Sequence, residues 1–168
     1  MKPSVRIIGI DPGLRKTGWG IIETKGSLLT FVACGSVDPD SKLGLADRLA
    51  ALFNGLSEII HGYTPHEAAV EETFMNKDPR SALKLGSARG IALVVPALAG
   101  LKVGEYSANQ IKKTVVGAGH ADKAQVQMMV KTLLPKSDFK SADAADALAI
   151  AITHAQYRTV RTLEGRIS

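Results

Sequence analysis

Short apolar runs dominate the first third of the chain and predict a strand-rich beginning. Residues Val5 to Ile10 form a β-branched, nearly continuous apolar run, which indicates a strand buried on both faces of a sheet. The stretches 17–23 and 28–35 predict two further strands, and the turn residues 25–27 between them favour a hairpin. Leucine, isoleucine and phenylalanine then recur at helical spacing over about 42–62, which predicts an amphipathic helix.

The remainder of the chain alternates between short strands and helices. Another buried strand is expected over 68–71 and a fifth strand over 103–106. Asp78 and Pro79 are typical of a helix start, because an N-cap acid is followed by a proline at the first helical position. Further helices are expected over 109–115, 123–134 and, after the cap residue Ser141, 142–157. This order predicts an α/β fold in which helices flank a five-stranded mixed sheet.

The length of the chain, 168 residues, is close to the commonest size of a single domain. We expect one domain over residues 1–157 and a basic, flexible tail over 158–168. No stretch approaches about 18 uninterrupted apolar residues, so we expect no membrane span, and the first residues do not resemble a signal peptide. The single cysteine, Cys34, excludes an internal disulfide and a cysteine-based zinc site. These features predict a cytoplasmic protein.

Positive charge is concentrated in the middle of the chain. The whole sequence has a formal net charge of +5, but residues 75–140 hold eleven basic and only four acidic side chains. A basic half of this kind suits a polyanion, because each phosphate contact releases condensed counterions. A solvated basic surface would give the same composition, so charge alone leaves a nucleic-acid interface and a plain surface as equal alternatives.

Four acidic residues occur where ionised side chains are costly. Asp11 and Glu71 each end a buried strand, and Asp143 and Asp146 lie on the first turns of the apolar last helix. Their i, i+3 spacing places both aspartates on one helical face. Buried carboxylates are usually paired with cations or bind metal, and three or four that converge suit Mg²⁺ or Mn²⁺. Two such ions about 3.5–4 Å apart can activate water and stabilise the leaving oxygen in phosphodiester hydrolysis.

Three of these four acids also have a purely structural explanation. Asp11 could form an Asx turn before a proline, Asp143 could favour the positive end of its helix, and Asp146 could pair with a lysine. Their recurrence at strand ends and on one helix, in a chain with a basic half, favours a common catalytic role. A zinc site fits less well, because the histidines are dispersed and each is expected to be a surface or capping residue. The histidines are His61, His66, His120 and His154.

Five segments together resemble the RuvC-type Holliday junction resolvases. In chain order they are GIDPG at 9–13, VEETF at 70–74, SALKLG at 81–86, KKTVVG at 112–117 and ADAADALA at 142–149. The first segment alone is weak, because other phosphate-handling folds use it, but all five in order are highly specific. The resemblance extends from about Val5 to His154, which is nearly the whole chain.

This resemblance implies a ribonuclease H-like fold and a homodimer that cuts four-way DNA junctions symmetrically, in homologous recombination and DNA repair. It implies Mg²⁺ as cofactor, with two ions per active site and Mn²⁺ as a substitute, and the branch-migration helicase complex RuvA-RuvB as a partner. By motif, the catalytic and metal-binding residues are Asp11, Glu71, Asp143 and Asp146. The expected DNA-binding residues are Phe74, Lys112 and Lys123 by the same match, and Lys84, Arg89 and Lys113 from the basic half.

Two enzymatic alternatives and one non-enzymatic alternative remain. The GIDPG segment also resembles the phosphate loop of actin-like ATPases and sugar kinases, but those enzymes close two such domains over a nucleotide, and 168 residues are too few. A ribosomal-RNA-processing nuclease of the same superfold would act on RNA. A structural junction-binding protein would use the basic half alone and would leave the two aspartates of the last helix unexplained. Cleavage of a junction with and without Mg²⁺ separates these alternatives.

Overall fold

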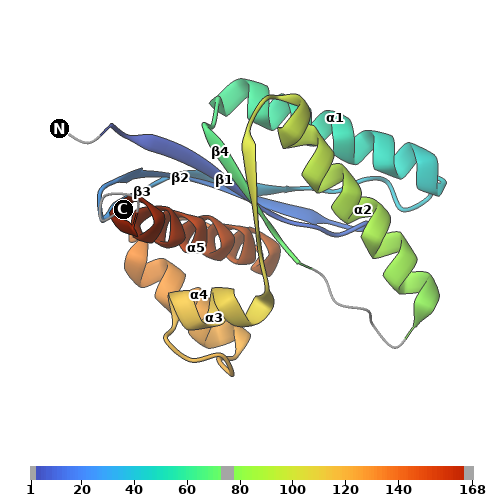
Figure 1. Cartoon of the computed structure of the whole chain (residues 1–168). Helices are drawn as coiled ribbons and strands as arrows, with labels where there is room; N and C mark the ends of the chain where they lie inside the picture. The colour runs from blue at the N-terminus through green and yellow to red at the C-terminus, as the bar shows by residue number, and fades with distance from the viewer. Residues whose placement is uncertain (1–2, 73–77, 165–168) are drawn as a thin grey trace.

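The computed structural model describes residues 3–72 and 78–164 (Figure 1). Within these ranges one sheet is formed by the strands β1 (Val5–Asp11), β2 (Thr17–Lys25), β3 (Leu28–Val37), β4 (Glu67–Glu71) and β5 (Lys102–Tyr106). The helices are α1 (Leu45–Tyr63), α2 (Pro79–Leu98), α3 (Ala108–Val115), α4 (Lys123–Leu133) and α5 (Ala142–Glu164). The strand order is β3-β2-β1-β4-β5, with β2 antiparallel to both its neighbours and β4 parallel to both of its own. The predicted five-stranded mixed sheet is confirmed.

Strand β1 lies in the middle of the sheet and is buried on both faces, as its apolar run predicts. Ile7 belongs to a core shared with α3, α4 and α5, whereas Ile8 and Ile10 belong to a second core shared with α1 and α2. Figure 1 shows the same division, with α1 and α2 on one side of the sheet and the other three helices on the opposite side. Because successive side chains of a strand point to opposite faces, Asp11 shares the face of Ile7, which α5 covers.

Two glycines let α5 lie directly on the sheet. A β-carbon at Gly9 would lie 2.1 Å from the carbonyl oxygen of Ala147, and one at Gly18 would lie 2.2 Å from the carbonyl oxygen of Asp143. No side chain fits at such distances unless the helix moves away, because protein interiors are close-packed. The alanine-rich composition of the last helix therefore has a packing reason. This contact also fixes the first turn of α5 against β2.

The last helix extends beyond its expected end. The sequence predicts that it ends at Tyr157 and that residues 158–168 form a flexible tail, but α5 continues to Glu164. The helix contains no glycine or proline that would stop it. Arg158 adds a tertiary anchor, because its Nε donates a hydrogen bond to Glu67 Oε1 on β4 at 2.7 Å. The described part of the expected tail is thus a continuation of the helix.

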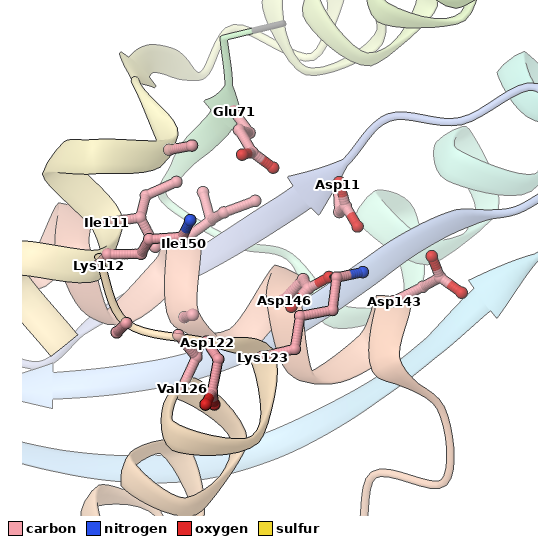
Figure 2. A pocket seen from close by; sticks show the side chains of 13 residues that line it. Asp11, Glu71, Ile111, Lys112, Asp122, Lys123, Val126, Asp143, Asp146 and Ile150 are labelled. Atoms are coloured by element: carbon pink, nitrogen blue, oxygen red, sulfur yellow. The ribbon is translucent and has the colours of Figure 1, made fainter. Parts of the chain in front are cut away.

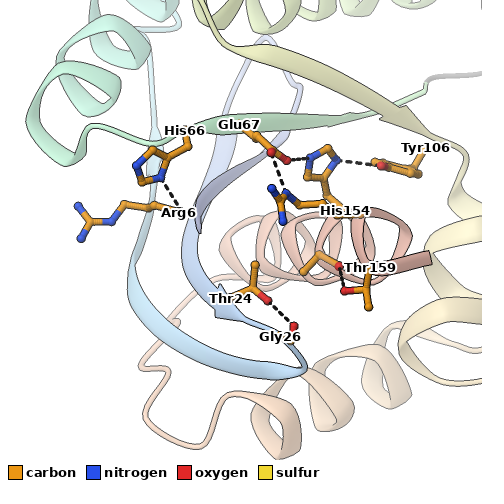
Figure 3. A network of polar contacts seen from close by, with 10 residues as sticks. Arg6, Thr24, Gly26, His66, Glu67, Tyr106, His154 and Thr159 are labelled. Atoms are coloured by element: carbon orange, nitrogen blue, oxygen red, sulfur yellow. Dashed lines mark hydrogen bonds and ion pairs between the residues drawn. The ribbon is translucent and has the colours of Figure 1, made fainter. Parts of the chain in front are cut away.

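A buried polar network ties α5 to the parallel strands β4 and β5 (Figure 3). His154 Nε2 lies 2.8 Å from Glu67 Oε2, and His154 Nδ1 lies 2.8 Å from the hydroxyl of Tyr106. Because the carboxylate can only accept, the ring donates from Nε2, and its Nδ1 is hydrogen-bonded to the tyrosine hydroxyl. The expectation that His154 is a surface or capping residue is wrong. It is 6% exposed, and its two partners satisfy both ring nitrogens inside the protein.

Helix α2 is long and apolar enough to cross a membrane by length and composition alone. It nevertheless carries Lys84 and Arg89, and Arg89 is ion-paired with Glu105 of β5. On its outer face Leu83 and Leu98 are 75% and 71% exposed. The described residues therefore leave an apolar surface on α2 uncovered.

Candidate active site

The parallel pairing of β1 and β4 brings Asp11 and Glu71 close together on one face of the sheet. Strands β1 and β4 are parallel neighbours, and their register puts the last residues of both strands at the same edge of the sheet. Ala69 packs in the core beneath α5, so Glu71, two residues later, faces the same side. Glu72 follows the end of β4 and is exposed. The two strand-end carboxylates therefore lie together on the α5 face.

The first turns of α5 supply the other two carboxylates. Ser141 precedes the helix, and its hydroxyl accepts a hydrogen bond from a backbone N–H of the first turn at 3.2 Å, which confirms the predicted cap. Asp143 and Asp146 follow on one helical face. Gly18 pairs with Asp11 across the β1–β2 ladder and also touches the backbone of Asp143. Backbone packing, rather than attraction between the acids, thus holds helix and strand ends together.

The four carboxylates line one pocket of about 470 Å³ at this edge of the sheet. Figure 2 shows them around its opening, with Lys112 on the side away from Asp143. Lys112 comes from α3 and Lys123 from α4, and both line the pocket. Apolar residues such as Ile111 and Ile150 form part of the wall. The structure therefore brings together all four acids that the sequence singled out.

Burial and mutual repulsion disfavour the ionised state of these acids. Burial, followed by the charges of Glu71, Asp146 and Asp143, raises the pKa of Asp11 to about 8. Burial also raises the pKa of Glu71 and of Asp146, although nearby lysines oppose the shift. Carboxylates arranged in this way lack compensating positive charge, which a bound cation would supply.

The donor set suits hard divalent cations, because carboxylate oxygens are the ligands that Mg²⁺ and Mn²⁺ prefer. Among the described residues, no three side chains of the metal-binding types stand close enough to form a ready-made cage. Lys123 Nζ lies 3.9 Å from Asp146 Oδ2, so the lysine pair considered as a structural explanation is present. The lysine side chain is 78% exposed, and such pairs contribute little. Most of the negative charge in the pocket therefore remains uncompensated.

The predicted DNA-binding residues occupy different positions. Lys112 and Lys123 line the acidic pocket, whereas Lys84 lines a second groove on the other side of the active site. Lys113 is exposed on α3 and does not line either of these hollows. Phe74 lies outside the described residues. The lysines thus surround the carboxylates on more than one side.

Arg89 supports the site from within the chain. Its guanidinium is ion-paired with Glu105, and its Nε donates a hydrogen bond to the backbone carbonyl of Glu71 at 3.4 Å. Within the chain, Arg89 thus helps to hold the end of β4, which carries a carboxylate of the pocket. Its contact with DNA stays a prediction.

Sequence reasoning missed two contributions to the site. Asp122 lines the pocket, and its carboxylate accepts a hydrogen bond from the backbone N–H of Gln125 at 2.8 Å in a reciprocal capping box. The spacing of aspartate and glutamine before an apolar helix is a signal that could have identified this cap. Gly18 positions Asp143, but its role becomes visible only when the packing of α5 on β2 is known.

Comparisons with known proteins agree with one another. The family model for crossover junction endodeoxyribonuclease RuvC matches residues 7–154. The protein of that name from Methylocella silvestris is 65% identical over 167 residues, which cover 99% of this chain and 95% of the relative. The one from Beijerinckia indica subsp. indica is 68% identical over 158 residues, covering 94% and 90%. A solved structure of T. thermophilus RuvC in complex with a Holliday junction substrate has a TM-score of 0.87 and 33% identity, covering 94% of this chain and 97% of that chain.

Proposed function

Because the chain belongs to the RuvC family of crossover junction endodeoxyribonucleases, we propose that its acidic pocket is where a strand of a four-way DNA junction is cut. Membership of this family makes the protein a Holliday junction resolvase, a structure-specific endonuclease that depends on divalent metal. The ribonuclease H-like fold agrees with this activity. The observation that carries the assignment of the site is the convergence of Asp11, Glu71, Asp143 and Asp146 on one pocket.

We assign Mg²⁺ as the cofactor, with two ions held by the four carboxylates and Mn²⁺ as a substitute. When bound, the ions would supply an activated water and positive charge at the leaving oxygen. The part played by the chain is positioning. The ends of β1 and β4 and the first turns of α5 hold the carboxylates around one opening, and their repulsion makes the pocket receptive to a cation.

The lysines near the pocket attract the DNA backbone. Lys112 and Lys123 stand beside the carboxylates, and Lys84 and Lys113 extend the positive surface around them. Phosphate contacts of this kind add about −0.9 each to the slope of log affinity against log salt. Replacement of Lys112 by alanine should therefore flatten that slope by about one unit and weaken binding to all sequences similarly.

The test is cleavage of a synthetic four-way junction in Mg²⁺ and in EDTA, with a linear duplex and an RNA duplex in parallel. We expect paired cuts in two opposite strands of the junction, only with metal. Asp11→Asn and Asp146→Asn should abolish cleavage and keep junction binding, because affinity comes from the lysines. Glu72→Gln is the matched control, since Glu72 is exposed beside the site, and it should cleave normally. Near-normal cleavage by Asp11→Asn would refute the site, and preferred cleavage of RNA would favour the RNA-processing alternative.

We also propose that the protein acts as a homodimer, because two symmetric incisions need two sites related by a two-fold axis. The outer face of α2 supports this proposal. Leu83 and Leu98 are exposed there, and β-carbons at Gly86 and Gly90 would meet none of the described residues within 4 Å. An open apolar face with small residues leaves room for a partner helix. Sedimentation should give a dimer at micromolar concentration, and Leu98→Glu should weaken it; a monomeric wild type would contradict the proposal.

Two further proposals rest on family membership alone. They are a cytoplasmic location and the branch-migration helicase complex RuvA-RuvB as a partner. Co-sedimentation of this protein with RuvA-RuvB on a junction, compared with sedimentation on the junction without the helicase, tests the second. Equal recovery in both samples would mean that the junction alone retains the protein.

A further inference from the structure

A second hollow adjoins the acidic pocket, and the function described so far does not use most of it. This hollow, here called the flanking groove, has a volume of about 710 Å³. Its charged lining residues are Arg15, Lys16, Arg48, Lys84 and Asp143. They come from the turn after β1, the first turn of α1, the first half of α2 and the start of α5. Figure 1 shows the ends of these elements gathered at one end of the sheet.

Asp143 is the only described residue that lines both the flanking groove and the acidic pocket. Figure 2 shows it at the side of the pocket away from Lys112. The two hollows therefore meet at a proposed metal ligand, with lysines of α3 and α4 on one side and the flanking groove on the other. A strand that crosses the carboxylates would leave the acidic pocket at this point.

The charge of the flanking groove is opposite to that of the acidic pocket. Four cationic side chains line the groove with one carboxylate, whereas five carboxylates line the pocket with two lysines. Lys16 Nζ lies 3.6 Å from Asp38 Oδ2, and these side chains are 41% and 53% exposed, so this pair is weak and can be exchanged for a phosphate. Arg15 is exposed and has no ion pair within the described residues. The groove thus presents net positive charge beside the cutting site.

Arg48 shows that part of this charge is held in place. Its Nη2 donates a hydrogen bond to the backbone carbonyl of Leu14 at 3.2 Å, which joins α1 to the turn after β1. Its Nε is buried and has no hydrogen-bond partner among the described residues. Because this Nε is closed to solvent, a contact of Arg48 with a phosphate would use the Nη atoms of the guanidinium. A guanidinium fork matches the geometry of a phosphate.

We propose that the flanking groove binds backbone phosphates of the cleaved strand on the side of Asp143 opposite to Lys112 and Lys123. The strand would then run from one set of basic residues to the other and place a single phosphodiester over the carboxylates between them. This inference rests on the proposed function and adds Arg15, Lys16 and Arg48 to the residues that bind the substrate.

Binding of a junction in EDTA, measured over a series of salt concentrations, gives the first test. The double variant Arg15→Ala/Lys16→Ala should flatten the slope of log affinity against log salt by one to two units, because about 0.9 is lost with each phosphate contact. When the salt concentration rises fourfold, each phosphate contact accounts for about a 3.5-fold loss of affinity. The double variant should be spared that factor for each contact it lacks. Lys25→Ala is the control, because Lys25 is exposed at the opposite end of β2. It should bind like the wild type.

Substrates with one neutral methylphosphonate linkage locate the contact. Moved along the cleaved strand, the neutral linkage should weaken wild-type binding at one or two positions on one side of the cut. In Arg15→Ala/Lys16→Ala, the neutral linkage at those positions should have no further effect. In Arg48→Gln, the neutral linkage should likewise have no further effect at those positions. Arg48→Lys should retain part of the affinity for the junction. Melting curves show whether either variant folds. If Arg48→Gln does not fold, the double variant still decides.

The inference is overturned if the double variant keeps the wild-type salt slope, or if the methylphosphonate effect persists in it. Cleavage of the unmodified junction by the wild type in Mg²⁺ separates this outcome from a failure of the proposed function. If the wild type cuts the junction and the double variant binds the junction as the wild type does, only the role of the flanking groove is refuted. A wild type that does not cut refutes the proposed function, whatever the variants do.

Discussion

Neutralising Asp11 should stabilise the metal-free protein while it abolishes cleavage. Burial and the charges of Glu71, Asp146 and Asp143 raise the pKa of Asp11 to about 8, whereas an aspartate in an unfolded chain has a pKa of about 3.9. The native state therefore binds a proton more tightly than the unfolded state. The stability that this proton confers is complete below about pH 4 and is lost as the pH rises toward 8.

The size of the effect follows from the shift. Each pKa unit corresponds to about 1.4 kcal/mol, but the acids of the pocket share protons and water enters it, so we expect Asp11→Asn to gain about 1–3 kcal/mol at pH 7.5. For a chain of this length that is a rise in Tm of about 2–10 °C. The gain should shrink steadily with falling pH and vanish below about pH 4, where the wild-type carboxyl becomes protonated in the unfolded state as well.

Thermal melting in EDTA, at several pH values, measures this gain. Mg²⁺ should then raise the Tm of the wild type more than that of Asp11→Asn, because a ligand that binds only the native state stabilises it. Glu72→Gln removes one negative charge beside Glu71 but outside the pocket, and its Tm should stay near that of the wild type. If Asp11→Asn melts at or below the wild-type temperature in EDTA, or if Mg²⁺ raises both equally, the carboxylates do not repel one another as described.

Three further variants test other parts of the structure. Gly18→Ala should lower the free energy of unfolding by about 1–3 kcal/mol and slow cleavage, because its β-carbon would collide with the carbonyl of Asp143. An unchanged Tm and unchanged activity would contradict the packing described. The hydrogen bond from His154, followed by that from Arg158, lowers the pKa of Glu67 to about 2. Glu67→Gln should therefore lower the free energy of unfolding by about 1–3 kcal/mol above about pH 5, and progressively less as the pH falls toward 2. A loss in melting curves that does not depend on pH would refute this. Phe74→Ala should slow cleavage of an intact junction more than that of a pre-opened one and leave Tm unchanged, since a stacked base is worth about 1–3 kcal/mol; a collapsed Tm with equal losses on both substrates would place the ring in the core.

The elements that the sequence predicted well are those whose signals are local. The N-cap Asp78 accepts a hydrogen bond from the backbone N–H of Arg80 at 3.1 Å and α2 begins at the following proline, as that pair of residues indicates. The apolar runs also predicted that Asp11 and Glu71 each end a buried strand, and the structure places them at the ends of β1 and β4. Local periodicity is sufficient in such cases because neighbouring residues alone determine it.

The features that were missed depend on residues far apart in the chain. His154 lies in an alanine-rich helix, and nothing nearby in sequence reveals that Glu67, 87 residues earlier, and Tyr106 satisfy its ring. The ion pair between Arg89 and Glu105 was also missed, because these residues lie 16 positions apart and on different elements, α2 and β5. The flanking groove likewise combines Arg48 with the turn after β1, whose residues are more than thirty positions away.

These distant contacts explain how one helix can carry repelling carboxylates and still be stably placed. The first turns of α5 bring Asp143 and Asp146 toward Asp11, which is unfavourable without a cation. The middle of the helix compensates, because the backbone beside Gly9 packs directly on β1. Its far end is fixed to β4 and β5 through the network around His154. Since these anchors do not involve the acid side chains, we expect α5 to keep its position whether or not a cation occupies the pocket.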